Sequence, residues 1–532
     1  MYKFRFLLCA FITTVVSQAS FADVRLNRLF SDGMVVQRET EIAIWGWADP
    51  GESVSVETSW GAKGEGVASA DGDWSTRIET PKAGGPFTIT VSGTNEIVLD
   101  DVLSGEVWLC TGQSNMDFAL SRFVGDAREV QYQPLVESIR NEVATATDPW
   151  IRHIEVPQTT SIYEAKVDFE GQWVEVKPGQ TEVISATGYF FAKELRKHLD
   201  VPVGLVECSW GGSLIEPWIS EDAFRSDEEL ESYFDAERSK AEALIAKMDA
   251  EGYVDTKYVE ALKKWEANGK KGREPRATVD PRDDRQVPAT LYNGMISSII
   301  PYSVKGSIWY QGESNAKHFP EEYQKRLTAM VETWRKDWGI GDFSFYWTQL
   351  AGYNSGEERQ YTWAMVGDQM RRALVLPNTG MVVLHDIGEA KDIHPHNKMD
   401  AGKRFALLAL EKDYGVKLPA ASGPLYGSFK VKKAGIKVRF DEVGSGLMVG
   451  RKVLMEDTVE VEENLGGFDI VGEDGEWKAA NAKIVSKRKV VVSHPDIVKP
   501  KAVRYAWLDN PVGANLYNKE GLPAAVFTTE ER

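Results

Sequence analysis

The sequence predicts an α/β fold in which a doubly wound parallel sheet is flanked by N-terminal and C-terminal β-domains. Three observations lead to it. Short strand-like segments fill residues 23–102, apolar strand-like runs alternate with amphipathic helical runs over residues 103–414, and strand patterns return over residues 415–532. Alternation of strands and helices is typical of βαβ units. With 532 residues, 42% of them hydrophobic, the chain is long enough for several separate cores.

The first 22 residues predict a secretory signal peptide. Lys3 and Arg5 precede an apolar run, and Ser20-Phe21-Ala22 is a small-x-small cleavage site. We therefore expect a secreted or periplasmic protein, cut before Asp23; an uncleaved anchor is the alternative. The apolar run is short for a membrane span, and no later segment has the length and apolarity of one, so we expect no membrane span after cleavage.

Residues 23–102 predict an N-terminal β-sandwich domain. Turn signals such as Asp49-Pro50-Gly51 and Ala70-Asp71-Gly72 separate short strands, which we place at residues 41–47, 53–58, 73–78 and 87–92. Strands at this even spacing are typical of a small antiparallel sandwich.

Residues 103–414 predict the α/β domain that carries the site. We place its parallel strands at residues 106–111, 203–209, 304–311, 343–350 and 381–386, and its helices at 186–199, 320–338, 362–374 and 399–410. A β insertion near residues 150–180 and a charged helical insertion near residues 221–290 interrupt this pattern. The second insertion is interpreted as a solvated projection, with a lid over the site as the alternative.

Residues 415–532 predict a second β-domain. Strand-like runs occur at residues 430–440, 468–471, 488–493 and 502–508, and glycine-rich turns lie between them.

Composition excludes several classes of function. The formal net charge is −18, from 62 basic and 80 acidic residues, and no basic block occurs along the chain, so we expect no nucleic-acid partner. Only 3 Cys and 7 His are present, which excludes a disulfide framework and leaves few ligands for a zinc site. We expect neither a metal nor a cofactor.

Small polar clusters follow three of the predicted parallel strands, and a fourth precedes a helix. They are Gly112-Gln113-Ser114-Asn115-Met116, Ser209-Trp210-Gly211-Gly212-Ser213, Gln311-Gly312-Glu313-Ser314-Asn315 and Asp392-Ile393-His394-Pro395. Because a doubly wound sheet binds its ligand at the carboxyl ends of the strands, we expect the four clusters to meet there.

The residue types in these clusters fit acyl transfer. Ser114, at an expected strand-to-helix turn, is the candidate nucleophile, His394 the candidate base and Asp392 the acid that orients it. The backbone N–H groups of Ser114 and Gly212 and the side chain of Asn315 are candidate donors to an oxyanion. Met116 stands where a second glycine would complete a G-x-S-x-G elbow, so the motif differs from that of α/β-hydrolases.

Other assignments compete with these. His318 is a second candidate base, and Ser213 and Ser314 are further candidate nucleophiles. Asp392, His394 and His396 together could hold a metal ion. Glu313 and Asp392 could form the carboxylate pair of a glycosidase.

The four clusters resemble those of bacterial sialate O-acetylesterase-like proteins, within the SGNH (GDSL-like) hydrolases. Further segments carry the likeness over nearly the whole mature chain, among them Leu29-Phe30-Ser31-Asp32-Gly33-Met34, Leu291-Tyr292-Asn293-Gly294-Met295 and Asn515-Leu516-Tyr517-Asn518-Lys519. The resemblance implies a flavodoxin-like SGNH domain and a metal-independent carbohydrate esterase, which removes O-acetyl groups from sialic acids or from plant cell-wall glycans such as xylan and xyloglucan.

The resemblance also implies roles for single residues. Ser114 would be the nucleophile, His394 the base and Asp392 the acid. Ser114, Asn315 and a glycine of the Gly211-Gly212 pair, with Gly212 favoured, would form the oxyanion hole. Many SGNH enzymes place the acid three residues before the histidine, whereas Asp392 is two before His394. A Ser–His dyad is therefore the alternative.

Two other functions remain in competition with a carbohydrate acetylesterase. The first is a lipid or thioester hydrolase of the same superfamily, against which no apolar segment flanks Ser114 as an acyl-chain channel requires. The second is a carbohydrate-binding protein that has lost catalysis, against which all four clusters are intact.

Overall fold

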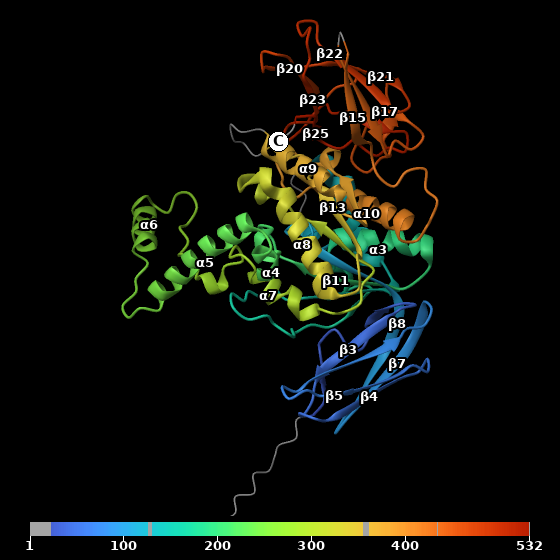
Figure 1. Cartoon of the computed structure of the whole chain (residues 1–532), viewed down its shortest axis with the longest axis vertical. Helices are drawn as coiled ribbons and strands as arrows, with labels where there is room; N and C mark the ends of the chain where they lie inside the picture. Colours follow the sequence, from blue (N-terminus) through green and yellow to red (C-terminus); the bar gives the residue numbers. More distant parts are fainter. Residues whose placement is uncertain (1–22, 126–129, 355–360, 433–434, 531–532) are drawn as a thin grey trace, which may run out of the picture.

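The computed structural model describes residues 23–125, 130–354, 361–432 and 435–530. The predicted signal peptide, residues 1–22, lies outside the described residues. Figure 1 shows an elongated molecule, with N-terminal strands at one end, C-terminal strands at the other and the α/β part between them. In the described part of the chain, no helix combines the length and the apolarity that crossing a membrane requires.

The chain is a mixed α/β protein built around one large sheet. Its path β10-β9-β11-β8-β12-β13-β14 has parallel pairs from β9 to β14 and an antiparallel strand β10 at the edge. The strands are β8 (Glu96–Gly112), β9 (Asp148–Glu155), β10 (Val174–Val176), β11 (Val203–Ser209), β12 (Gly306–Tyr310), β13 (Ser344–Gln349) and β14 (Thr379–Val383). The five parallel strands that the sequence predicts are β8, β11, β12, β13 and β14. Numbered in chain order, these five lie in the sheet in the order 2-1-3-4-5, which is a doubly wound order.

Helices cover both faces of the parallel strands. On one face, Trp108, Leu205 and Ile308 pack with helices α2 (Gln133–Thr145), α3 (Ala186–Leu199) and α10 (Lys398–Lys412). On the other face, Leu109 and Trp347 pack with helices α8 (Tyr323–Trp338) and α9 (Thr362–Arg372). The strands are buried on both sides, which explains their nearly continuous apolar sequence.

Strand β8 is longer than predicted and crosses the expected boundary at residues 102/103. Its first half pairs antiparallel with β7 (Gly84–Ser92), and its second half pairs parallel with β11 and β12. The run from Val102 to Gly105 is fully buried, and the strand continues through its Ser104-Gly105 pair, although such a pair is common in turns. The N-terminal strands are therefore continuous with the large sheet, and the division into domains stays a prediction.

The other N-terminal strands form two antiparallel layers, apart from β2, which pairs parallel with β8. They are β1 (Arg25–Leu26), β2 (Val35–Gln37), β3 (Glu41–Trp47), β4 (Ser53–Thr58), β5 (Lys63–Val67) and β6 (Asp73–Glu79). Strands β1, β3 and β6 make one sheet, and β4, β5 and β7 extend the large sheet. Alternation such as Trp74, Thr76 and Ile78 inward on β6 matches the predicted pattern.

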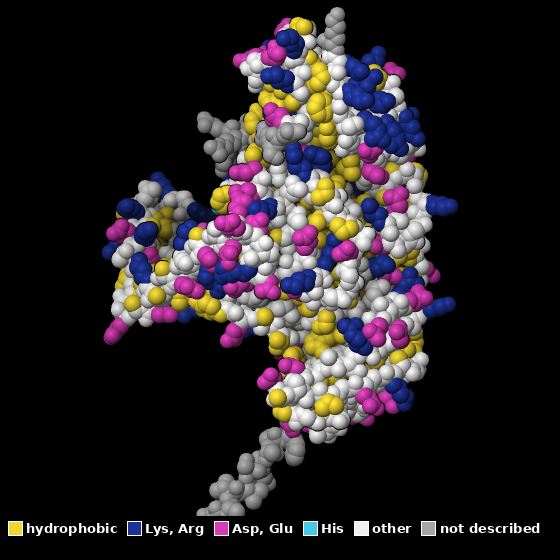
Figure 2. All heavy atoms as spheres, viewed as in Figure 1, with side chains coloured by type: hydrophobic (Ala, Val, Ile, Leu, Met, Phe, Trp, Pro, Cys, Tyr) yellow, Lys and Arg dark blue, Asp and Glu magenta, His cyan; other side chains and the backbone are white. Residues whose placement is uncertain are grey.

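The charged insertion forms helices α4 (Glu221–Arg225), α5 (Glu228–Met248) and α6 (Thr256–Ala267). Helices α5 and α6 project sideways from the molecule, and Figure 2 shows charged side chains of both signs over this projection. Helix α6 has no buried residue, and α5 buries only Leu230, Phe234 and Ala241. This is the arrangement expected of a solvated projection, although residues at its C-terminal end return to the site.

The C-terminal strands form small antiparallel sheets. They are β15 (Leu425–Lys432), β16 (Gly435–Asp441), β17 (Leu447–Arg451), β18 (Val459–Glu460), β19 (Phe468–Val471), β20 (Trp477–Ala479), β21 (Asn481–Ser486), β22 (Lys489–Ser493), β23 (Ala502–Tyr505), β24 (Leu516–Asn518) and β25 (Phe527–Thr528). The single strand predicted over residues 430–440 is wrong, because β15 and β16 pair antiparallel there. Phe429 and Val431 alternate with polar residues in the first strand, as Ile436, Val438 and Phe440 do in the second, and the change of phase between them is the signal of the break that the prediction missed.

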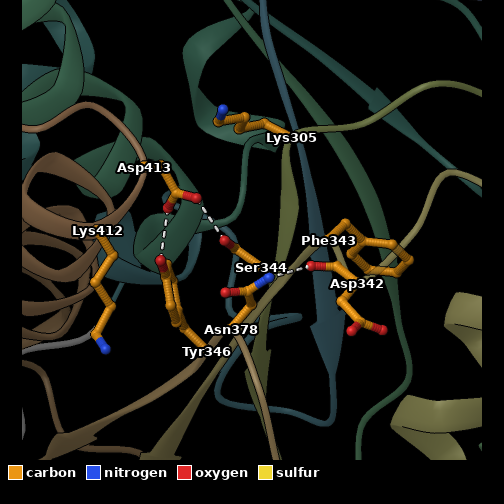
Figure 3. A pocket seen from close by; sticks show the side chains of 8 residues that line it. All are labelled: Lys305, Asp342, Phe343, Ser344, Tyr346, Asn378, Lys412 and Asp413. Atoms are coloured by element: carbon orange, nitrogen blue, oxygen red, sulfur yellow. Dashed lines mark hydrogen bonds between the residues drawn. The ribbon is translucent and has the colours of Figure 1, made fainter.

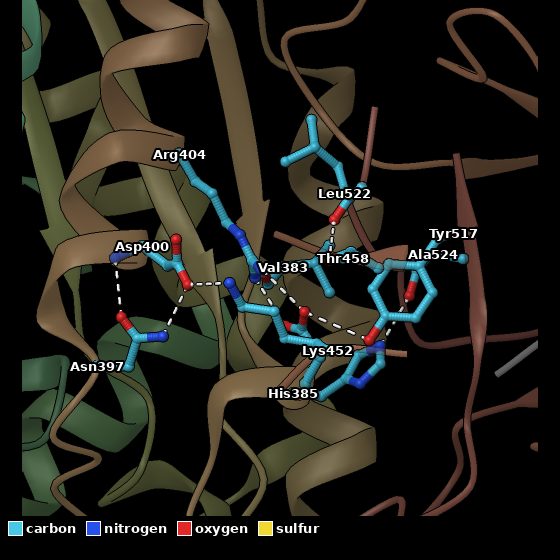
Figure 4. Close-up of polar contacts among 12 residues, drawn as sticks. Val383, His385, Asn397, Asp400, Arg404, Lys452, Thr458, Tyr517, Leu522 and Ala524 are labelled. Carbon is cyan, nitrogen blue, oxygen red and sulfur yellow. Dashed lines mark hydrogen bonds and ion pairs between the residues drawn. The ribbon is translucent and has the colours of Figure 1, made fainter. Parts of the chain in front are cut away.

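A polar network joins these C-terminal strands to helix α10 (Figure 4). The buried guanidinium of Arg404 pairs with Asp386 through both nitrogens, at 2.7 and 2.8 Å. Lys452 Nζ lies 2.7 Å from Asp400 Oδ2, and Asn397 Nδ2 donates to the carbonyl of Leu454 at 3.0 Å. Because Asn397 caps α10 directly after the His394 segment, the C-terminal region supports that segment.

Candidate active site

The hydroxyl of Ser114 and the imidazole of His394 lie within hydrogen-bond distance. Their Oγ and Nε2 atoms are 2.9 Å apart, although 280 residues separate them in the chain. Ser114 is half-buried, so the oxygen is both held and accessible. This is the geometry in which an imidazole can take the proton of a serine as that serine attacks a carbonyl.

Ser114 lies in a turn after β8 and not at the start of a helix. The backbone N–H of Met116 donates to the carbonyl of Gln113 at 2.8 Å, and the next α-helix, α1 (Arg122–Gly125), begins later. The expected strand-to-helix turn is therefore wrong, because the turn closes on itself through local hydrogen bonds. The backbone N–H of Ser114 has no acceptor among the described residues.

Asp392 lies close to His394 but is not ideally placed as its partner. His394 Nδ1 and Asp392 Oδ1 are 3.6 Å apart, which is longer than a hydrogen bond. The same carboxyl oxygen accepts the backbone N–H of His394 at 2.8 Å. Interaction with the His394 side chain lowers the pKa of Asp392, so this carboxylate is charged beside the imidazole at neutral pH.

Hydrogen bonds hold the first three clusters against one another. The backbone N–H of Trp210 donates to the carbonyl of Gly112 at 3.0 Å, and that of Gln113 donates to the carbonyl of Tyr310 at 2.9 Å. The side-chain oxygen of Gln113 accepts the N–H groups of Gly312 and Ser314, at 3.4 and 3.3 Å. The predicted convergence at one edge of the sheet is therefore observed.

The Gly211-Gly212 pair lies beside the serine. A Cβ at Gly211 would lie 3.4 Å from the Cβ of Ser114, and Gly212 has φ +77°, in the left-handed region that favours glycine. The backbone N–H groups of both glycines lack an acceptor in the described part of the chain.

Asn315 is buried and bound to the segment that follows the glycine pair. Its Oδ1 accepts the backbone N–H of Ile215 at 3.0 Å, and its Nδ2 donates to the carboxylate of Glu216, 3.0 Å from Oε2. Nδ2 also lies 3.3 Å from Oε1 of the same carboxylate, and it donates to no other residue that the structure describes. Asn315 is fully buried, so its side chain is held against the segment that contains Ile215 and Glu216.

A buried network links the Ser114 turn to the His394 segment. Asn115 Nδ2 donates to the carbonyl of Ile393 at 3.1 Å and also to the carboxylate of Glu313. Lys398 Nζ donates to Asn115 Oδ1 at 2.6 Å and to the carbonyl of Pro395 at 2.7 Å. Asn115 and the Lys398 side chain that binds it therefore hold the backbone on both sides of His394.

The charges in this network are strongly perturbed by burial. Burial lowers the pKa of Lys398 to about 7, although the carboxylates of Glu313, Glu389 and Asp392 favour its charged form. Burial raises the pKa of Glu313, against the hydrogen bond from Asn115. Buried ionisable groups with shifted pKa values gather at functional sites more often than elsewhere.

A comparison with protein families assigns the chain. Residues 104–271 and 260–411 match the family described as "Carbohydrate esterase, sialic acid-specific acetylesterase". The chain belongs to this carbohydrate esterase family. This match confirms, at the level of the family, the resemblance to sialate O-acetylesterase-like proteins. It also confirms the prediction of a carbohydrate O-acetylesterase.

Individual relatives of this esterase agree with the assignment. It is 27% identical to the sialate O-acetylesterase of Mus musculus over 450 residues, which cover 77% of each chain. It is 26% identical to the human sialate O-acetylesterase over 434 residues, 75% of this chain and 73% of the relative. A crystal structure of a carbohydrate acetylesterase from Xanthomonas citri superposes with a TM-score of 0.77 and 32% identity, covering 96% of this chain and 100% of the other.

The structure shows the surroundings of the competing candidates. His318 is exposed and makes no hydrogen bond to Ser114 in the described part of the chain, and Ser213 is buried with its hydroxyl accepting the indole N–H of Trp218 at 3.0 Å. Ser314 is half-buried, and its backbone N–H binds Gln113. The carboxylate of Glu313 accepts from Asn115, so it supports the serine turn.

The side chains of Asp392, His394 and His396, the alternative metal ligands, do not converge on one point. His396 Nδ1 faces Glu389 Oε1 at 2.8 Å, whereas His394 Nε2 faces Ser114. Over the described ranges, no group of three His, Cys, Asp or Glu side chains has the arrangement of a metal site.

Asn115 and Lys398 are site residues that the sequence interpretation missed. Asn115 stands beside Ser114 in its motif, and Lys398 follows the histidine by four residues. Their positions in the motifs were a usable signal, but nothing in the sequence shows that the two side chains meet.

The opposite edge of the sheet carries a different pocket of the esterase (Figure 3). Lys305, Ser344 and Asn378 line it at the amino ends of the strands, and Tyr346 donates to Asp413 at 2.6 Å. This pocket lies at the edge of the sheet away from Ser114.

Proposed function

We propose that this protein is a serine esterase that removes O-acetyl groups from carbohydrates through an acetyl-enzyme, with an SGNH-type α/β domain as its scaffold. The observation that carries the proposal is the 2.9 Å distance between Ser114 Oγ and His394 Nε2. The doubly wound strand order and the four joined clusters support the SGNH assignment.

In the first half of the reaction, Ser114 Oγ attacks the acetyl carbonyl while His394 Nε2 takes its proton. The carbonyl oxygen becomes an oxyanion, to which the backbone N–H groups of Ser114 and Gly212 and the side chain of Asn315 would donate. His394 then returns the proton to the sugar oxygen as the C–O bond breaks. The sugar leaves with a free hydroxyl, and the acetyl group stays on Ser114.

In the second half, water takes the place of the sugar. His394 removes a proton from the water as it attacks the acetyl-serine, the same donors bind the second oxyanion, and acetate leaves as Ser114 recovers its proton. Asp392, held charged beside the imidazole, stabilises the imidazolium that forms in both halves.

We infer that the substrate is an acetylated sugar, either a sialic acid or a plant cell-wall glycan such as xylan or xyloglucan. The names of the relatives, sialate O-acetylesterase and carbohydrate acetylesterase, support this class. We also propose that the protein acts outside the cytoplasm, in the secreted or periplasmic state for which residues 1–22 are the sequence signal.

Labelling with a fluorophosphonate probe tests the mechanism. The wild type is expected to be labelled, and Ser114→Ala is expected to lose both labelling and at least about a thousandfold in kcat while keeping its fold. An unlabelled wild type indicates a binding protein without catalysis. A preference for octanoyl over acetyl p-nitrophenyl ester indicates a lipid or thioester hydrolase.

A further inference from the structure

Arg285 lies directly against the glycine pair of the active site. A Cβ placed on Gly212 would lie 3.1 Å from Arg285 Nη2, and a Cβ placed on the neighbouring Gly211 would lie 3.4 Å from the Cβ of Ser114. The guanidinium and the nucleophile therefore flank adjacent glycines. Arg285 comes from the C-terminal end of the charged insertion, outside the four sequence clusters.

The next residue anchors this end of the insertion to the site. Gln286 Nε2 donates to the carbonyl of Gly212 at 2.7 Å, and Gln286 Oε1 accepts the backbone N–H of Leu214 at 3.0 Å. This pair of hydrogen bonds fixes the backbone of the insertion against the glycine loop. Arg285 is thus held in place by its neighbour.

The guanidinium of Arg285 has no partner among the residues that the structure describes. No hydrogen bond or ion pair joins the Arg285 side chain to any residue that the structure describes, and its Nε is buried without an acceptor. By contrast, Arg282, three residues earlier, is exposed and pairs with both Asp280 and Asp249. The residue as a whole is half-buried, so the rest of the guanidinium can reach a molecule bound beside the glycines. Because a buried donor without an acceptor is unfavourable, Nε also gains from an acceptor that a bound ligand supplies.

We propose that Arg285 is a substrate-binding residue whose guanidinium donates hydrogen bonds to an oxygen of the sugar that carries the acetyl ester. The inference rests on the proposed function, since it concerns the same site. Two kinds of sugar oxygen have the required chemistry. A carboxylate forms the stronger, charge-assisted pair with a guanidinium, and hydroxyl oxygens of a neutral sugar accept its hydrogen bonds as well.

If Arg285 binds the sugar, replacing it should lower kcat/KM on sugar esters more than on esters without a sugar. We would compare Arg285→Met, Arg285→Lys and wild type on p-nitrophenyl acetate, on an O-acetylated sialic acid and on acetylated xylo-oligosaccharides. We expect Arg285→Met to lower kcat/KM on at least one acetylated sugar by about 10- to 100-fold, the effect of losing a hydrogen bond to a charged group. The loss on p-nitrophenyl acetate should be clearly smaller, and Arg285→Lys should restore part of the activity.

Arg282→Met is the matched control, since Arg282 belongs to the same segment but points to an exposed ion-pair cluster. It should not change the ratio of sugar-ester to p-nitrophenyl acetate activity. A loss confined to the sialic acid ester identifies a carboxylate as the acceptor, and a loss that includes the xylo-oligosaccharides identifies a hydroxyl oxygen.

Two results would overturn the inference. One is an unchanged activity of Arg285→Met on both sugars while the wild type is active. The other is an equal loss on all three esters with a lower Tm, which would make Arg285 a structural residue. Failure of the proposed function looks different, because then the wild type neither reacts with the fluorophosphonate nor hydrolyses any of the esters.

Discussion

The ammonium group of Lys398 lies 2.6 Å from the amide oxygen of Asn115, across 283 residues of sequence. The same ammonium holds the carbonyl of Pro395, one residue after His394. Through this link the first residue of α10 holds the serine turn and the histidine segment at a fixed separation.

Replacing Lys398 with methionine should therefore slow the reaction. The substitution keeps the buried volume but leaves two acceptors without a donor, and we expect kcat on p-nitrophenyl acetate to fall by about 10- to 100-fold. The rate of fluorophosphonate labelling should fall with it. Lys403→Met, at an exposed position of the same helix, is the control and should behave as wild type. Normal kcat in Lys398→Met would show that the link is dispensable.

Asp392→Asn should lower kcat less than Ser114→Ala or His394→Ala does. The distance of 3.6 Å between Asp392 Oδ1 and His394 Nδ1 describes a weak partner. We expect a fall in kcat of about 10- to 100-fold, against about a thousandfold or more for Ser114→Ala and His394→Ala. Steady-state kinetics of the three variants check this order. If Asp392→Asn is as inactive as Ser114→Ala, a full triad operates.

Asp117→Asn should change how stability depends on pH. Burial raises the pKa of Asp117 to about 6, and the carboxylates of Glu207 and Glu155 add to the effect, while Arg122 opposes it. The pKa in the unfolded chain is about 3.9, so between pH 4 and 6 the folded state binds more protons and the wild type loses stability as pH rises.

The asparagine variant lacks this loss. Its Tm should gain on that of the wild type as pH rises from about 4 to 6, and the gain should stay constant above that range. Calorimetry across this range measures it, with Asp71→Asn in an exposed turn as the control. A Tm difference that does not vary with pH would exclude Asp117 as the source.

Chelation should leave activity unchanged. Among the described residues, His394 Nε2 faces the serine and His396 Nδ1 faces Glu389, so neither histidine is presented to a metal ion with the carboxylate of Asp392. Acetate release should be the same before and after dialysis against EDTA. A loss that added zinc restores would revive the metal interpretation.

Asn397→Ala should weaken both the fold and the reaction. Asn397 caps α10 by accepting the N–H of Asp400 at 3.0 Å, and it binds the carbonyl of Leu454. Losing such a cap costs about 1 kcal/mol of unfolding free energy, with a range of about 0.5–2. Because the His394 segment leads into this cap, kcat should fall as well.

A second cap separates the two effects of that substitution. Asp255 caps helix α6 of the projection by accepting the N–H of Tyr258 at 3.1 Å. Asp255→Ala should lower stability without changing kcat, as denaturant unfolding and kinetics can show together. Equal losses of kcat in the two variants would mean that α10 has no particular link to the site.

Local signals explain which parts of the fold were predictable. The helix predicted at residues 186–199 and the strand predicted at 203–209 have the observed bounds, since Ser185 caps the first and continuous burial marks the second. The strand predicted at 430–440 was wrong because it passed over the change of phase in the apolar alternation between Val431 and Ile436. The length of β8 is not evident from the sequence, because Ser104-Gly105, a pair common in turns, lies within the strand.

Some features of the candidate site could likewise be predicted from the sequence, and others could not. Sequence motifs were enough to name Ser114, His394 and the glycine pair as candidates, because acyl transfer requires those residue types, and the structure brings these candidates close together. They did not reveal that Ser114 lacks a helix behind its N–H, that Asn315 also binds Glu216, or that Arg285 comes from the charged insertion.

The sequence by itself determined the chemistry available to this protein and the local elements that carry it, because residue type and periodicity act over a few neighbouring residues. Only the tertiary structure decided that Lys398 meets Asn115, that β8 joins two sheets and that Arg285 lies by Gly212. Those contacts join residues far apart in the chain, and the physical reason is that packing of the whole sheet and its helices, not any local preference, determines which distant groups become neighbours.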